Sequence, residues 1–156
     1  MRTKPAKKTL SARGCLVGSI AVFIVSLFLA TVILSLRSNG LQSLKIGDDS
    51  LQISFAKTIE EKKAGLCCRD SLPEDQGMLF MYDTPGVHQF WMKNTRIPLD
   101  MYWLDSEKKI IHIEHNVMPE TYPKTFGPNQ PALYVLETNA GYAKMHNIKI
   151  GDKAYF

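Results

Sequence analysis

One stretch of this chain is long and apolar enough to cross a lipid bilayer, and it determines how the remainder can be organised. The 22 residues of Cys15–Leu36 contain no charged side chain. As an α-helix rising about 1.5 Å per residue, they reach about 33 Å, against a bilayer hydrocarbon core of about 30 Å. Residues 15–36 are therefore predicted to form a single transmembrane helix.

The basic residues around this stretch predict its orientation. Five Lys and Arg side chains precede it within residues 1–14, and Arg37 follows it. Because basic residues stay on the cytoplasmic side, residues 1–14 are predicted to be a cytoplasmic tail. Residues 37–42 are then a tether, and residues 43–156 an exported domain. The chain is expected in the plasma membrane as a single-pass signal-anchor protein, with its C-terminal domain extracytoplasmic.

A cleaved signal peptide is the alternative interpretation of the same stretch. The apolar part of a signal peptide usually spans about 7 to 15 residues and ends at a small-x-small cleavage site. Ser38-Asn39-Gly40 is a poor match to such a site. An uncleaved anchor, in contact with membrane lipid, is the interpretation that these features favour.

The charge of the predicted exported domain argues against nucleic-acid binding. Six of the nineteen basic residues lie in residues 1–37, which contain no acid, so residues 38–156 carry thirteen bases and fifteen acids, a net charge of −2. Nucleic-acid binding needs a cationic face that neutralises phosphates. We therefore expect no nucleic-acid partner.

Residues 43–156 combine short β-rich runs with closely spaced turn residues. Gly47-Asp48-Asp49-Ser50 separates two such runs and predicts a hairpin. Thr58 and Glu61 have the spacing of a capping box, which predicts a helix to about Leu66. A second short helix is predicted over residues 138–145, and four prolines in residues 116–131 predict an irregular loop.

The predicted strands are residues 44–46, 51–55, 78–82, 87–92, 99–104, 109–115, 133–137 and 153–156. Many short strands separated by turns are typical of all-β domains. The expected fold is mainly β: an antiparallel β-sandwich or barrel-like domain with one or two short helices, preceded by the transmembrane helix.

Several motifs in this region occur together in one known family. They are Gly65-Leu66 with Arg69, Gly77-Met78-Leu79-Phe80, Phe90-Trp91-Met92-Lys93-Asn94-Thr95, Pro98-Leu99-Asp100 and Val135-Leu136-Glu137. In order and spacing they resemble the domain-of-unknown-function 192 family, over about residues 43–156. The resemblance implies a compact β-rich domain, often exported or membrane-tethered, with no established activity. Cys67 departs from the family, which usually has a methionine after Gly-Leu.

The motif around Trp91 has two interpretations. Alternation along residues 87–94 directs Trp91 and Lys93 to one strand face, and both faces contain large apolar groups. The strand is then buried on both sides, with Trp91 in the core. In the functional interpretation, a ligand-binding rim contains Lys93, Asn94, Thr95 and Asp100 above an apolar floor of Trp91, Met78 or Phe80. There Lys93 holds a carboxylate or sugar acid; as an alternative, it forms an ion pair with Asp100 or Glu137.

Asp100 and Glu137 are the candidate catalytic residues, because each lies in a strand between apolar neighbours that raise the pKa of a carboxyl group. A paired-carboxylate hydrolase acting on envelope carbohydrate requires a defined distance between them. His112, Glu114 and His115 are the best metal candidates, but on a strand His115 turns away from the other two. No metal and no cofactor are predicted.

Cys67 and Cys68 face an oxidising compartment if the predicted topology holds. Three states are open to them: an adjacent disulfide, a bridge between two copies of the chain, or buried thiols. The Cys-x-x-Cys spacing of disulfide oxidoreductases is absent.

The preferred functional hypothesis is an exported module that binds a small-molecule, carbohydrate or envelope-protein ligand without catalysis. The hydrolase is the second class, and a purely structural assembly module is the third. The sequence does not determine an oligomeric state.

Overall fold

The computed structural model describes residues 41–156. The predicted tail, the predicted transmembrane helix at residues 15–36 and most of the tether fall outside this range. Among residues 41–156, no helix is both long and apolar enough to cross a bilayer.

The described residues form a mainly β domain with short helices, as predicted. In chain order the elements are β1 (Gln42–Ile46), β2 (Asp49–Ala56), α2 (Ile59–Ala64), β3 (Gln76–Gly86), β4 (Phe90–Trp91), β5 (Leu99–Leu104), β6 (Ile110–Val117), the 3-10 helix η1 (Pro119–Thr121), β7 (Thr125–Phe126), β8 (Ala132–Asn139), α3 (Tyr142–Met145) and β9 (Ala154–Tyr155).

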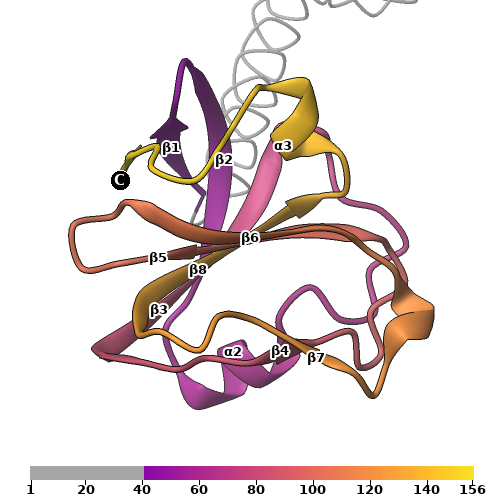
Figure 1. Ribbon diagram of the computed structural model, residues 1–156. Coiled ribbons are helices and arrows are strands. Elements are labelled where there is room, and N and C mark those ends of the chain that lie inside the picture. Colours follow the sequence, from indigo (N-terminus) through magenta and orange to yellow (C-terminus); the bar gives the residue numbers. More distant parts are fainter. Residues whose placement is uncertain (1–40) are drawn as a thin grey trace, which may run out of the picture. The chain divides into compact units, whose positions relative to one another are not determined.

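Seven of the strands form one sheet in the order β6-β5-β8-β3-β2-β1-β9, which curls into a half-barrel (Figure 1). β4 and β7 form a separate two-stranded sheet. β9 pairs with β1 at one edge, and its neighbour Lys153 bridges to Lys109, beside β6 at the other edge. The C-terminal segment therefore joins the two edges and protects backbone groups that would otherwise be unpaired.

The sheet is mixed, which corrects the prediction of a purely antiparallel domain. The predicted hairpin of β1 and β2 is present, with Leu44 opposite Leu51. β2 and β3, however, run parallel, with Ile53 opposite Gly77. Parallel neighbours require a crossover connection, and here the segment that contains α2 supplies it. Of the two predicted architectures, the curled sheet agrees with the barrel-like one and not with the sandwich.

Three predicted elements are clearly shorter than expected, and one predicted loop contains regular structure. The strand at residues 87–92 reduces to Phe90–Trp91, which pairs only with β7. β8 continues to Asn139, so the second helix begins only at Tyr142. The final strand is limited to residues 154–155. The predicted loop at 116–131 contains η1 and β7, which the proline pattern did not predict.

Both faces of the large sheet are covered, so the domain has two apolar clusters. All six residues of β5 are buried, and they alternate between the clusters. Met101 and Trp103 join the cluster that contains Phe80, while Tyr102 and Leu104 join the one that contains Tyr142 of α3. In Figure 1, α2, β4 and β7 lie on one side of β5 and β8, and α3 lies on the other.

The two tryptophans give a matched pair for testing this core. Trp103 is fully buried and its Nε1 donates to the His88 carbonyl at 2.8 Å, whereas Trp91 is 52% exposed. Trp103→Phe should lower the free energy of unfolding by about 2 kcal/mol, because it removes a hydrogen bond and core volume. Trp91→Phe should change it by less than about 0.5 kcal/mol. Urea unfolding of both variants checks this, and equal losses would contradict the assignment.

Candidate functional site

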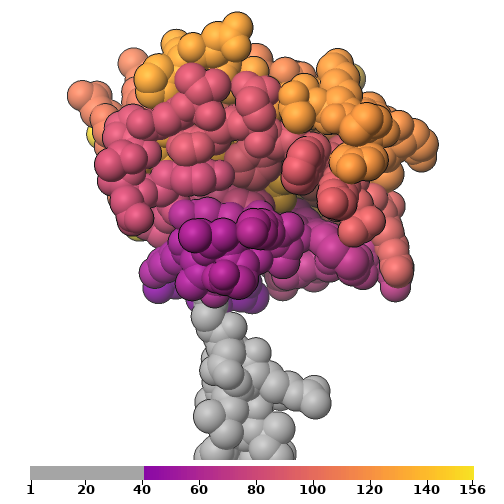
Figure 2. All heavy atoms as spheres, turned by 90° about the horizontal axis from the view of Figure 1, so that it is seen from below, coloured from indigo at the N-terminus to yellow at the C-terminus, as the bar shows by residue number. Residues whose placement is uncertain are grey.

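A cavity of about 410 Å³ opens on the side of the sheet that carries α2 and β4. We call it the Glu137 pocket. Its lining residues are Ile59, Lys62, Lys63, Ala64, Gly65, Leu66, Phe80, Tyr82, Gln89, Phe90, Trp91, Lys93, Thr95 and Glu137. Figure 2 views this side, where the purple segment containing α2 borders the pink segments that follow it in sequence.

One wall of the pocket depends on the predicted capping box. The Thr58 hydroxyl accepts from the Glu61 amide at 3.1 Å, and the Glu61 carboxylate accepts from the Thr58 amide at 2.9 Å. These bonds satisfy amides that the first turn of α2 leaves unpaired, and they hold the pKa of Glu61 below its usual value. The short helix then places Lys62 and Lys63 at the pocket.

Gly65 allows the chain to leave α2 directly over the pocket floor. It has a φ of 52°, in the left-handed region that favours glycine. A Cβ atom at this position would lie 3.3 Å from Phe80 Cζ and 4.0 Å from Glu137 Oε2. The Gly-Leu motif therefore has a structural role: it lets the backbone approach the buried acid closely.

Glu137 is the chemically unusual residue of the pocket. Its side chain comes from β8 and is only 4% exposed, and its Oε2 has no hydrogen-bond partner among the described residues. Burial raises the pKa of Glu137 to about 8, because the ionised form loses its hydration without gaining a compensating partner. At neutral pH the group is therefore mainly a neutral carboxylic acid that can donate or accept a hydrogen bond.

Aromatic side chains form much of the remaining wall. The rings of Phe80 and Phe90 meet edge to face, with centroids 4.8 Å apart. Tyr82 is half-buried, and its desolvation, together with the charge of Glu137, raises the pKa of its hydroxyl to about 12. Trp91 contributes an exposed ring at the rim. The pocket thus combines an apolar wall with a buried polar group.

The structure brings together some of the predicted site residues. Trp91, Lys93 and Thr95 line the Glu137 pocket, with Phe80 in the predicted floor, whereas Asn94, Asp100 and Met78 do not. Trp91 is not in the core, because the short β4 pairs only with β7 and leaves the ring exposed. Within residues 41–156, Lys93 forms no ion pair with Asp100 or with Glu137.

Asp100 lies on the opposite face of the sheet from Glu137. Asp100 is opposite Thr138 in the β5–β8 ladder, and Met101 is opposite Glu137, so alternation separates the two carboxylates. The Asp100 oxygens accept backbone amides of Asn116 and Ala143, each at 2.9 Å. The structure thus separates the two candidate catalytic residues, and Asp100 ties β6 and α3 to β5.

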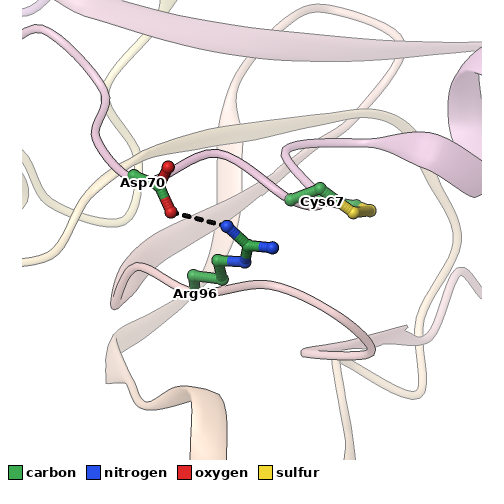
Figure 3. Close-up of a disulfide and its surroundings, with 4 residues drawn as sticks. Cys67, Asp70 and Arg96 are labelled. Atoms are coloured by element: carbon green, nitrogen blue, oxygen red, sulfur yellow. Dashed lines mark hydrogen bonds and ion pairs between the residues drawn. A yellow bond between two sulfur atoms is a disulfide. The ribbon is translucent and has the colours of Figure 1, made fainter.

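Cys67 and Cys68 form an adjacent disulfide in the segment that follows the pocket residue Leu66 (Figure 3). The Cys68 amide donates to the Asn94 carbonyl at 3.0 Å, and Arg96 pairs with Asp70 at 2.6 Å. Both contacts connect this segment to the loop that carries Lys93 and Thr95. The ion pair is highly exposed and contributes little to stability.

Two of the histidines, His112 and His146, each lie beside one carboxylate. His112 contacts Glu114 at 2.9 Å on a shared strand face, as the alternation predicts. Among residues 41–156, no group of three or more potential ligands is arranged to hold a metal. A second cavity, beside α3, contains the Asp49 carboxylate, which accepts from Tyr142 and lies 2.8 Å from His146 Nδ1.

Four polar residues of the Glu137 pocket were not predicted from the sequence: Lys62, Lys63, Tyr82 and Gln89. The two lysines lie in the last turn of α2, where basic residues are common for reasons of helix stability alone. Only the placement of α2 beside β3 and β8 gives them a further role, and no local sequence signal encodes that placement.

Comparisons with known proteins agree with the fold. The model of the DUF192 family, described as "Uncharacterized ACR", matches residues 42–156, and the chain belongs to this family. A proposed transcription regulator from Sinorhizobium meliloti 1021 is similar in structure, with a TM-score of 0.72 and 29% identity over 74% of this chain and 93% of that one. A protein of unknown function from Novosphingobium aromaticivorans DSM 12444 has a TM-score of 0.71 and 31% identity, over 74% of this chain and 85% of that one. No curated protein matches the chain.

Proposed function

We propose that this domain binds a small-molecule ligand in the Glu137 pocket. The observation that carries the proposal is the Glu137 carboxyl group, buried in the pocket wall with one oxygen unpartnered. A buried polar group without a hydrogen bond costs free energy, and such groups are uncommon except where function retains them. A ligand that hydrogen-bonds to Glu137 recovers that cost on binding.

We further propose that the domain is extracytoplasmic and is anchored in the plasma membrane by residues 15–36, with residues 37–42 as the tether. The uncharged stretch and the excess of basic residues before it support this placement. The test is a pair of reporter fusions to the C-terminus. Alkaline phosphatase, active only after export, should be active, and a cytoplasmic fluorescent reporter should be dark. The reverse result would contradict the topology.

A hydrolase is the second candidate function, because a neutral buried acid resembles a general acid. A two-carboxylate glycosidase also needs a second acid facing the same substrate. Among residues 41–156, Glu137 is the only acid lining the pocket, and the sheet separates it from Asp100. The geometry therefore favours binding over this type of hydrolysis.

A metabolite library screened by thermal unfolding tests the binding proposal. A ligand present at about 100 times its Kd stabilises the folded state by about 2.7 kcal/mol. Compounds that raise the Tm of the wild type should have a much smaller effect on Trp91→Ala and Glu137→Ala. Tyr155→Ala, which removes an equally exposed aromatic ring outside the pocket, is the control.

Two results would contradict the binding proposal. One is a library without hits. The other is a set of hits whose stabilisation is the same in wild type, pocket variants and control. A partner protein that co-purifies equally with wild type and pocket variants, in the absence of hits, would favour the assembly-module hypothesis instead.

A further inference from the structure

We infer that the ligand of the Glu137 pocket is an acidic saccharide, in which a pyranose ring stacks on the aromatic wall and its carboxylate lies at the lysine-bearing rim. This inference rests on the proposed function and specifies the chemical class of the ligand. Charge, ring surface and hydrogen-bonding groups at the pocket each support it.

The charge of the pocket favours an anion. Lys62 and Lys63 approach from α2, and Lys93 approaches from the loop after β4, so ammonium groups border the pocket on two sides. Lys62 Nζ lies 4.5 Å from the centre of the Tyr82 ring, and Lys93 Nζ lies 5.8 Å from the centre of the Trp91 ring. Glu137, the single lining acid in the part of the chain that the structure describes, is mainly neutral at pH 7. None of the described lining residues therefore offsets the positive rim, which attracts a carboxylate.

The aromatic wall favours a ligand with a flat apolar face. Trp91 is 52% exposed at the rim, and the half-buried Phe90 ring meets Phe80 deeper in the pocket. An exposed aromatic ring offers apolar area at low conformational cost, and the C–H face of a pyranose can cover it without leaving ligand hydroxyls unpaired. This arrangement orients the ring of a sugar while its hydroxyls remain free for polar contacts.

The polar groups of the wall distinguish a saccharide from a simple aromatic acid. The neutral Glu137 carboxyl offers one donor and an acceptor, and the Thr95 hydroxyl offers another of each. Gln89 donates to the Pro128 carbonyl at 3.4 Å, which leaves its amide oxygen as an acceptor. An aromatic acid would leave these groups unpaired, whereas several sugar hydroxyls match them.

Calorimetric titration of the full-length chain in detergent micelles with tri-galacturonic acid, at pH 6.5 and low salt, tests the inference. Neutral galactotriose is the matched ligand. We expect the acidic trimer to bind at least about tenfold more tightly, which corresponds to about 1.4 kcal/mol. The Lys62→Gln/Lys93→Gln variant should lose at least about tenfold in affinity for the acidic trimer. Lys45→Gln/Lys149→Gln, which removes two lysines outside the pocket, should bind like the wild type.

The outcomes separate this inference from the proposed function. Equal affinity for the two trimers, or equal losses in the two double-lysine variants, would overturn the acidic-saccharide assignment. So would the absence of any binding of the acidic trimer while library compounds still stabilise the wild type through Glu137, and in that case the pocket remains a binding site for another class. Absence of both trimer binding and library hits would overturn both proposals.

Discussion

Raising the pH from 4.5 to 8.5 should lower the free energy of unfolding of the wild-type chain by about 4 kcal/mol more than that of the Glu137→Gln variant. Glutamine imitates the neutral acid in shape and cannot ionise, so the difference between the two proteins isolates the titration of Glu137. Urea unfolding at a series of pH values measures it.

Stability falls with rising pH because the folded chain holds the Glu137 proton more tightly than the unfolded chain does. Glu137 has a pKa of about 8 in the folded chain, against an ordinary value of 4.5. Between these pH values the folded chain keeps a proton that the unfolded chain releases, so each unit of rising pH favours unfolding by about 1.4 kcal/mol. The stability that the protonated group contributes is complete below pH 4.5 and is lost as the pH rises through 8.

An exposed acid of α2 provides the control for this experiment. Glu60→Gln makes the same substitution at an exposed carboxylate on the surface, and its unfolding is measured over the same pH range for comparison. If the curves of wild type and Glu137→Gln were parallel, Glu137 would be ionised and solvated in the folded chain, and the pocket would lack its central feature.

Asp100→Ala should lower the free energy of unfolding by about 3 to 5 kcal/mol, because two backbone amides lose their acceptor. The Ala143 amide is buried, and it belongs to the first turn of α3, whose N-cap Gly141 supplies no side-chain bond. Asp100 thus acts as a remote cap for α3 while also holding β6 through Asn116. Chemical denaturation of the variant measures the loss.

Asp105 supplies a matched comparison for Asp100. Its carboxylate also accepts two backbone amides, those of Glu107 and Lys109, but in an exposed turn where water replaces a lost acceptor. Asp105→Ala should therefore cost about 1 kcal/mol or less. Wild-type stability in Asp100→Ala would contradict the structural role of Asp100, and an effect confined to ligand binding would restore it as a site residue.

Local features of the fold were predictable from the sequence, and long-range pairing was not. The Thr58–Glu61 capping box and the bounds of β5 each depend on residues that lie within a few positions of one another in the sequence. The parallel pairing of β2 with β3 depends on how the chain returns after α2, for which the sequence contains no local signal. An antiparallel sheet was therefore the expectation that local patterns alone support.

The same distinction applies to the site. The motif around Trp91 and Lys93 contributes residues to the Glu137 pocket, and adjacent aromatic and basic residues are visible in the sequence itself. Asp100 and Glu137 look equivalent in the sequence, since both interrupt apolar strands. Their opposite orientations follow from a register that aligns Asp100 with Thr138, and register is a property of the folded sheet.

The central claim is that Glu137 is a buried, mainly neutral acid in a ligand pocket, and a carbon-13 NMR titration of its side-chain carboxyl tests this without knowledge of the ligand. Comparison with Glu137→Gln assigns the signal. We expect a titration midpoint near pH 8 in the folded chain. A midpoint near pH 4.5 would show an ordinary, hydrated carboxylate and would contradict the burial of a neutral acid in this pocket.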